Sequence, residues 1–206
     1  MILAIDTSSA NCSVALLTPD GAVIARHDEL IGRGHAEHLM PIVRDLVGAR
    51  VPSTVVAGVG PGSFTGIRVG LAAAQGLAIG WSVPILGVNS LALLAAADEG
   101  SVDDGDTIAA AILGGHGELF VQSFRRRSLD PLGPPLNLPP TLAAQEIDAA
   151  LVIGNGATAL VAARGFGRAI DDCPSAARLG RLPNDLRSQL ARPLYVRAPD
   201  ARPAAA

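Results

Sequence analysis

The first residues whose types and spacing could support chemistry are Asp6, Thr7, Ser8 and Ser9, which follow a short apolar run at the start of the chain. A carboxylate beside hydroxyl groups, placed between two antiparallel strands, can bind a metal–nucleotide phosphate. The alternative is a structural turn, in which Asp6 and the hydroxyl groups bind backbone amides. The spacing alone leaves both interpretations open.

A second candidate is the turn Gly60-Pro61-Gly62-Ser63, which lies between the apolar run that starts at Val55 and a helix-compatible run over 66–80. A glycine-rich turn before a helix can bind an anion, because exposed amides and the helix dipole favour negative charge there. The turn lacks both the G-x-G-x-x-G spacing and the GK[ST] ending of known phosphate-binding loops. It could equally be a tight strand-to-helix corner without a ligand.

Two further chemistries are only weakly indicated. His35 and His38 lie three residues apart and could bind a metal, but the pattern is not HExxH and no third ligand is evident. Ser63 stands in Pro-Gly-Ser-Phe-Thr-Gly, which is not the G-x-S-x-G nucleophile elbow that a peptidase or esterase would use. We therefore expect no catalytic residue and no metal ligand.

The composition excludes several classes of protein. All sixteen basic residues are arginine, so the lysines of P-loop enzymes, kinases and Schiff-base enzymes are absent. A net charge of −3 gives no overall attraction to nucleic acid. No apolar run reaches the ~18–20 residues of a membrane helix, and the first apolar run meets Asp6 at once, unlike a signal peptide. We expect a cytoplasmic protein that does not contact a membrane.

The elements that would position these residues alternate along the first half of the chain. Apolar periodicity predicts strands over 2–5, 12–17 and 22–30, a helix over His35–Val47, a strand from Val55, a helix over 66–80, a strand over 83–88 and a helix over 91–97. This order predicts a mixed sheet covered by helices. Residues 99–106 are acidic and predict a loop or hinge.

A shorter but similar series follows. It comprises strands over Thr107–Leu113 and 118–124 around the turn 114–117, a proline-rich irregular segment over 129–140, a helix over 142–150 capped by Thr141, and a strand over Leu151–Ile153. A helix over 175–182, a short strand over 193–197 and a frayed end at 202–206 close the chain. We predict two related lobes, an N-terminal one over 1–98 and a smaller one over 99–206, whose terminal helix or strand could pack back on the first lobe.

Two helices of the first lobe carry more apolar or small surface than one core face requires. Met40 and Val47 widen the apolar stripe of the first helix, and glycine and alanine cover most of the second. Each glycine inside a helix costs up to about 1 kcal/mol relative to alanine, which indicates close approach of another helix. We predict that a partner docks on these helices, at His35, Leu39, Met40, Val43, Arg68, Leu71, Ala74 and Gln75.

Several segments together closely resemble the TsaB family. They are ILAIDTSSANCSVALL, GRGHAEHLMPIV, VGPGSFTGIRVGLAAAQGLA and VPILGVNSLALLA, with PLYVRAPDA near the C-terminus. The similarity is dense over 1–97, sparse over 98–190 and returns at 193–201. TsaB proteins are the bacterial partner subunits in the synthesis of threonylcarbamoyladenosine at position 37 of tRNA.

The resemblance implies a two-lobed α/β fold of the actin-like ATPase type, which sugar kinases and Hsp70 share and which is RNase H-like. It implies a subunit that is not an enzyme, because the metal-binding histidines of the catalytic subunit TsaD do not carry over. It also implies docking on TsaD through the first-lobe helices, joint recruitment of the ATPase TsaE, a homodimer through the same surface when TsaD is absent, and contact with tRNA only indirectly, through the complex.

A nucleotide site would on this view be vestigial. It would comprise Asp6, Thr7, Ser8, Gly60, Gly62 and Ser63, with weak ATP or ADP binding at most and no required cofactor. The chain departs from the family pattern in its short linker over 48–54 and in the turn 114–117, which puts a productive nucleotide cleft in doubt. The alternative function is a small kinase or ATPase that uses Asp6 and the loop 60–66.

Overall fold

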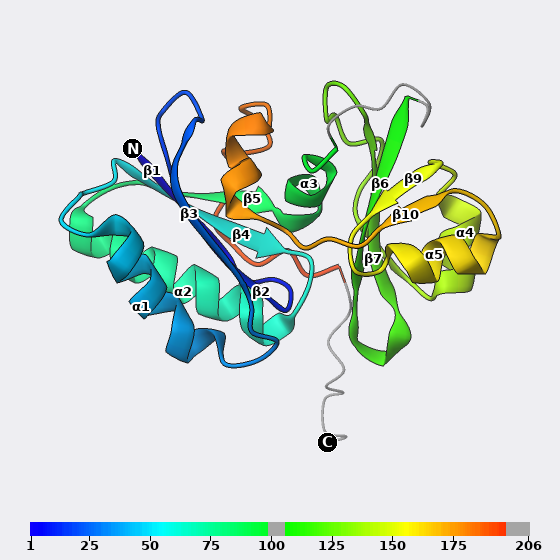
Figure 1. The fold of residues 1–206 in the computed structure, drawn as a ribbon, viewed down its shortest axis with the longest axis horizontal. Helices are drawn as coiled ribbons and strands as arrows, with labels where there is room; N and C mark the ends of the chain where they lie inside the picture. Colours follow the sequence, from blue (N-terminus) through cyan, green and yellow to red (C-terminus); the bar gives the residue numbers. More distant parts are fainter. Residues whose placement is uncertain (99–105, 197–206) are drawn as a thin grey trace, which may run out of the picture.

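Two mixed β-sheets stand side by side, with helices on the outer face of each and short helical segments between them (Figure 1). The computed structural model describes residues 1–98 and 106–196. The predicted loop at 99–105, the end of the predicted strand at 197 and the predicted frayed end at 202–206 lie outside the described residues.

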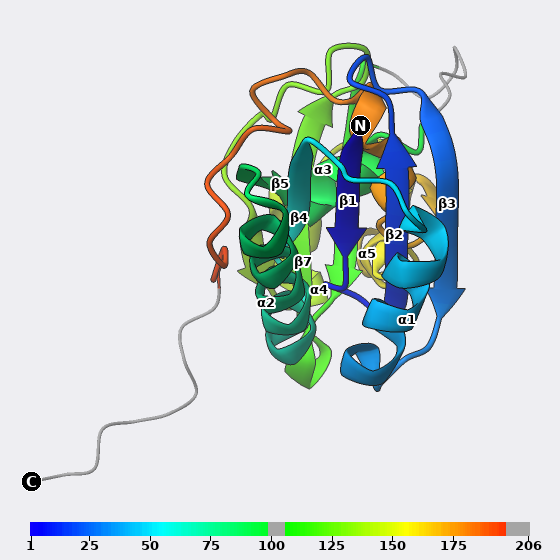
Figure 2. The ribbon, with the colours of Figure 1, turned by 90° about the vertical axis from the view of Figure 1, so that its left-hand side faces the viewer.

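The first sheet has five strands in the order β3-β2-β1-β4-β5. Strands β1, β2 and β3 pair antiparallel, and β1, β4 and β5 pair parallel. Helices α1 and α2 lie together over one face of this sheet (Figure 2). The bounds are β1 Ile2–Asp6, β2 Asn11–Leu17, β3 Val23–Leu30, α1 His35–Val47, β4 Thr54–Gly60, α2 Phe64–Trp81, β5 Ile85–Asn89 and α3 Ser90–Ala95.

The second sheet repeats this topology in the order β8-β7-β6-β9-β10, with the same alternation of antiparallel and parallel pairs. Helices α4 and α5 take the places that α1 and α2 hold in the first lobe. The bounds are β6 Thr107–Leu113, η2 Gly115–Gly117, β7 Leu119–Arg125, β8 Leu136–Leu138, α4 Pro140–Glu146, β9 Leu151–Ile153, α5 Ala157–Arg164, β10 Arg168–Ile170 and η3 Ala176–Arg181. The predicted α/β fold class, with two mixed sheets flanked by helices, is confirmed.

The two lobes exchange the segment that follows the last strand of each sheet. Besides touching its own strands β4 and β5, α3 packs on β6 and β7 of the second sheet, and η3 packs on β1, β2 and β3 of the first. Every residue of α3 is buried. One hydrophobic cluster therefore runs from Ala4 and Val56 through α3 to Ile108 and Phe124. Two further clusters lie under α1 and α2 and under α4 and α5.

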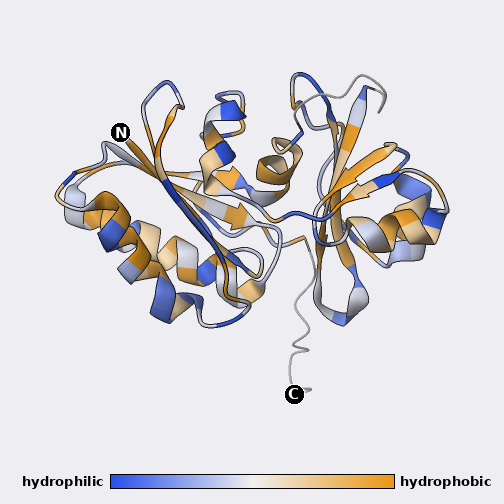
Figure 3. Cartoon of the chain, viewed as in Figure 1, coloured by the Kyte–Doolittle hydropathy of each residue, from blue (hydrophilic) through white to orange (hydrophobic). Residues whose placement is uncertain are grey.

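The apolar residues follow this layering, and the strands are mostly hydrophobic apart from the edge strand β3, which is largely polar and exposed (Figure 3). In α1 the buried residues Leu39, Val43 and Val47 recur at four-residue spacing, which places one helix face on the sheet. Glycines in left-handed conformations stand at both ends of this helix, Gly34 with φ 88° and Gly48 with φ 59°. Among the described residues no helix is both long and apolar enough to cross a membrane.

Several local predictions are corrected. Residues 193–196 form no strand; the chain instead pairs with the first lobe, where Gln189 bridges Gly87 and the Leu194 amide donates to Val59. Helix α4 begins at Pro140 rather than after Thr141, because proline suits the first helical turn. The segment predicted as a helix over 175–182 is the 3₁₀ helix η3. Strand β10 and helix α5 were not predicted.

Candidate functional site: the cleft between the lobes

Asp6 is the last residue of β1 and is only 1% exposed. Its Oδ1 accepts hydrogen bonds from the amide and hydroxyl of Ser8, at 2.9 and 2.7 Å, and its Oδ2 accepts one from the hydroxyl of Ser90 at 2.6 Å. Burial raises the pKa of Asp6, and these hydrogen bonds offset part of the rise. Both carboxylate oxygens are engaged by this chain, so the geometry favours the structural interpretation of the turn.

We expect Asp6→Asn to reveal this raised pKa in the pH dependence of stability. The carboxyl has an ordinary pKa of 3.8 and a higher one in the folded protein. Its contribution to stability is therefore greatest below the ordinary pKa and declines as the pH rises through the folded-state pKa. Asparagine does not titrate. The free energy of unfolding of the variant minus that of the wild type should thus increase from about pH 4 to about pH 7; a difference that stays constant in urea titrations would contradict the assignment.

Thr7 brings α2 unusually close to the β1–β2 turn. Its hydroxyl donates a 2.7 Å hydrogen bond to the carbonyl of Gly66. A Cβ at Gly66 would lie 2.0 Å from the Thr7 carbonyl oxygen, and one at Gly70 would lie 2.4 Å from the Thr7 Oγ1. Gly66 and Gly70 are therefore needed because the β1–β2 turn of the same chain lies against them. The prediction that these helix glycines allow a partner helix to approach is corrected. A Cβ at Gly76 or Gly80 would meet nothing within 4 Å.

The corner between β4 and α2 is docked on the same turn. The Ser63 amide donates to the Ser8 carbonyl at 2.6 Å, and a Cβ at Gly62 would lie 2.1 Å from that carbonyl oxygen. The Ser63 hydroxyl accepts from the Gly66 amide and caps α2. The predicted strand–turn–helix order is therefore present. The Ser63 amide and the Gly66 amide, which could have bound an anion, form hydrogen bonds within the chain instead.

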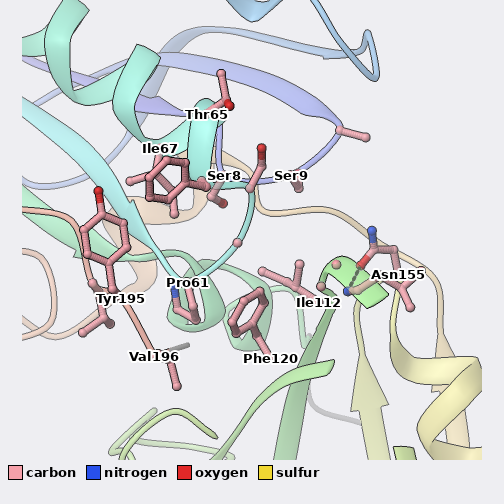
Figure 4. A pocket seen from close by; sticks show the side chains of 18 of the residues that line it. Ser8, Ser9, Pro61, Thr65, Ile67, Ile112, Phe120, Asn155, Tyr195 and Val196 are labelled. Atoms are coloured by element: carbon pink, nitrogen blue, oxygen red, sulfur yellow. Dashed lines mark hydrogen bonds between the residues drawn. The ribbon is translucent and has the colours of Figure 1, made fainter. Parts of the chain in front are cut away.

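A cleft of about 970 Å³ opens where the turns of the two lobes meet (Figure 4). Of the predicted nucleotide-site residues, Ser8, Gly62 and Ser63 line the cleft, and Asp6, Thr7 and Gly60 are not among its lining residues. The second lobe supplies the opposite wall, with Ile112, Leu113, Gly114, Gly115, His116, Phe120 and Asn155. The C-terminal segment adds Leu194, Tyr195 and Val196.

Arg68 lies at this cleft together with two aromatic rings. Its Cζ is 3.7 Å from the centre of the Phe64 ring, and its Nε donates to the Tyr195 hydroxyl at 2.9 Å. The two rings are 5.5 Å apart. From the sequence we predicted Arg68 as part of a partner-binding surface and made no prediction for Tyr195. The one available signal for Tyr195 was the PLYVRAPDA segment of the family resemblance.

Most of the predicted partner-binding residues lie inside the chain's own core. His35, Leu39, Val43, Leu71 and Ala74 are buried, so these side chains cannot form a surface on the folded monomer, and this part of the prediction is corrected. They face inward because they are the residues that hold α1 and α2 on the first sheet. Met40, Arg68 and Gln75 are exposed, and α2 adds the exposed residues Ala72, Gly76, Ile79 and Gly80.

His35 and His38, the pair that could bind a metal by its spacing but from which we expected no metal ligand, differ in burial. His35 is buried, with Nε2 3.4 Å from the Asn11 carbonyl oxygen, and His38 is exposed. Within residues 1–98 and 106–196, no three or more His, Cys, Asp or Glu side chains gather in a group that could hold a metal ion. Cys12 and Cys173 are both free, and burial raises the pKa of the Cys12 thiol to about 11.

Comparison with known proteins gives consistent relatives. The family model described as TsaD, tRNA N6-adenosine threonylcarbamoyltransferase, matches residues 26–131. The "tRNA threonylcarbamoyladenosine biosynthesis protein TsaB" of Escherichia coli (strain K12) is 39% identical over 132 residues, which are 61% of this chain and 55% of that protein. The Haemophilus influenzae protein of the same name is 38% identical over 101 residues, 47% of this chain and 42% of that protein. The chain thus spans about half the length of these curated relatives.

A crystal structure from Pseudomonas aeruginosa is similar over almost the whole chain. It is described as an uncharacterized protein with similarity to peptidase YEAZ, and it is 31% identical with a TM-score of 0.79. The match covers 95% of this chain and 99% of that one. The two lobes described above are therefore those of this crystal structure, and the chain belongs to the TsaB/YeaZ family.

Proposed function

We propose that this chain acts in the biosynthesis of threonylcarbamoyladenosine in tRNA, as a non-catalytic subunit that binds and activates a TsaD-type threonylcarbamoyltransferase. The names of the matched relatives and of the family model support the pathway. We propose further that a TsaE homologue joins this complex, that tRNA meets the chain only through it, and that the chain forms a homodimer through the same face when the transferase is absent. No cofactor is required for this role.

The outer face of α2 is the observation that carries the docking proposal. It exposes Ala72, Gln75, Gly76, Ile79 and Gly80, and the neighbouring helix α1 exposes Met40. Ile79 is 74% exposed, and the two glycines leave open space around the backbone. Small residues let a partner helix approach closely, and burying a side chain such as Ile79 contributes about 1.5–3 kcal/mol. This face suits a helix of the transferase.

The state of Asp6 supports a subunit that does not itself process nucleotide. A metal–nucleotide mechanism would use the Asp6 carboxylate, whose oxygens already accept three hydrogen bonds from Ser8 and Ser90. The size of the cleft favours the alternative, a small actin-like kinase or ATPase that binds ATP or ADP. The two functions differ in a simple assay, because hydrolysis of magnesium ATP by the isolated chain would favour the alternative.

We expect Ile79→Asp to weaken binding to the transferase by at least about 30-fold, since it would bury an unpaired carboxylate at the docking face. Calorimetry with the purified TsaD homologue measures the affinity, and the tRNA modification assay with TsaD and TsaE measures the functional loss. Leu142→Asp on α4 is the matched control, because Leu142 is an exposed apolar helix residue of the other lobe; it should leave both unchanged.

Either of two results would contradict this proposal. If Ile79→Asp binds the transferase as the wild type does, the docking face is not the outer face of α2. If tRNA is modified equally well with and without this chain, the activating role itself is lost.

A further inference from the structure

We propose that the cleft between the lobes binds a small organic anion, a phosphate or carboxylate joined to a planar or apolar body, through Arg68 and without a divalent cation. This site is distinct from the outer face of α2 and does not depend on the partner proposed above.

Arg68 is a positioned cation with binding capacity to spare. The Phe64 ring supports the guanidinium from one side, and the Tyr195 hydroxyl accepts from Nε. No carboxylate among the described residues forms an ion pair with Arg68. Its two terminal NH₂ groups therefore remain available as donors in a fixed fork. Such a fork matches the two oxygens of a carboxylate or phosphate.

The surroundings of Arg68 favour negative charge. No aspartate or glutamate is among the described residues that line the cleft, whereas Arg68, His116 and several hydroxyl groups are. The first turn of α2 carries no acidic residue, and this 18-residue helix starts beside the cleft. The dipole at its N-terminus adds to the attraction that Arg68 exerts on an anion. The ligand's charged group is thus placed between Arg68 and the start of α2.

The rest of the cleft suits the body of the ligand rather than its charge. Ile112, Phe120, Leu194 and Val196 give it apolar surface. Ile112, Phe120 and Val196 are visible below Ser8 and Ser9 in Figure 4. Phe64 and Tyr195 are 56% and 50% exposed, so ring surface is available for a planar group. A volume of about 970 Å³ accommodates a molecule of nucleotide or drug size.

The cation of this site is Arg68 and not a metal ion. The carboxylate nearest in sequence to the lining serines is Asp6, which is buried, accepts three hydrogen bonds and does not line the cleft. A metal bridging Asp6 to a phosphate would have to displace Ser8 and Ser90. Binding through Arg68 leaves these contacts intact, so chelation of divalent ions should not weaken it.

The test is calorimetry on the full chain in EDTA with two charged probes, AMP for the phosphate and N-acetyltryptophan for the carboxylate. At least one should bind with a dissociation constant below about 1 mM. Its uncharged counterpart, adenosine or N-acetyltryptophan amide, should bind at least about 10-fold more weakly. The probe that binds identifies which anion the site takes, and added magnesium should not strengthen binding.

Arg68→Gln should weaken the bound probe by about 10-fold or more, and Arg68→Lys should retain part of the affinity because it keeps the charge. Tyr195→Phe, which removes only the hydroxyl that positions Arg68, should cause a smaller loss. Arg50→Gln is the control, since Arg50 is exposed on a surface away from the cleft and binds the Leu46 carbonyl. The proposal is overturned if neither probe binds, if Arg68→Gln binds as the wild type does, or if binding requires magnesium.

Discussion

Gly66→Ala should destabilise the protein by about 2–4 kcal/mol, whereas Gly76→Ala in the same helix should stabilise it by up to about 1 kcal/mol. The added methyl group at Gly66 would lie 2.0 Å from the Thr7 carbonyl oxygen, which is backbone and cannot rotate away. At Gly76 the methyl group meets nothing within 4 Å, so only the better helix propensity of alanine is felt. The opposite signs follow from position alone.

Urea denaturation of the two variants beside the wild type measures both effects. Because each substitution adds the same methyl group to one helix, Gly76→Ala controls for helix propensity and for the unfolded state. Equal effects of the two substitutions would mean that α2 does not lie against the β1–β2 turn as described. Gly70→Ala should destabilise the protein, as Gly66→Ala does, since its Cβ would lie 2.4 Å from the Thr7 Oγ1.

Arg126→Met should destabilise the protein by about 3–5 kcal/mol, because it removes the guanidinium that binds both oxygens of the buried Asp98 carboxylate. The Asp98 and Arg126 side chains are each 7% exposed. Arg126 donates through Nε and through Nη2, the latter at 2.9 Å, to the two oxygens of Asp98. Arg181, at the end of η3, also donates to the Asp98 carbonyl at 2.6 Å. The pair therefore ties the segment after α3 to the second sheet.

The double variant Asp98→Leu/Arg126→Met should recover much of the loss, since it removes both charges and keeps apolar volume. Arg44→Met is the surface control: its pair with Asp45 is 75% and 69% exposed, and exposed pairs contribute about 0–1 kcal/mol. Chemical denaturation gives all the values. An Arg126→Met variant as stable as Arg44→Met would show that the Asp98 carboxylate is solvated in the folded protein.

The sequence predicts the order of the elements well where hydrophobic periodicity is strong. Helix α1 has the predicted bounds because its apolar residues recur every three to four positions and glycines flank it. Helix α5 and strand β10 were missed because their apolar patterns are weak: only Ala157 and Leu160 are buried in α5, and β10 has no fully buried residue. The prediction of a strand near the C-terminus was wrong because Gln189 and Leu194 contact the first lobe through isolated hydrogen bonds rather than a ladder.

The candidate site was only partly accessible to sequence reasoning. The turn at Asp6 and the corner at Ser63 were identified, but their contact with each other depends on tertiary packing. Arg68 and Tyr195 are 127 positions apart, and no local pattern reports a pair so distant. The sequence shows the excess of glycine in α2 but not its two causes. Gly66 and Gly70 contact Thr7, whereas the other glycines lie on an open outer face, and spacing cannot distinguish these positions.

The exchange of α3 and η3 between the lobes has a consequence for the independence of the two halves. Each half has the same strand order, and each half sends its closing segment to cover the other's sheet. This is the arrangement of a domain-swapped dimer within one polypeptide. Either half expressed alone would lack the segment that covers one face of its sheet, so the two halves depend on each other to complete their cores.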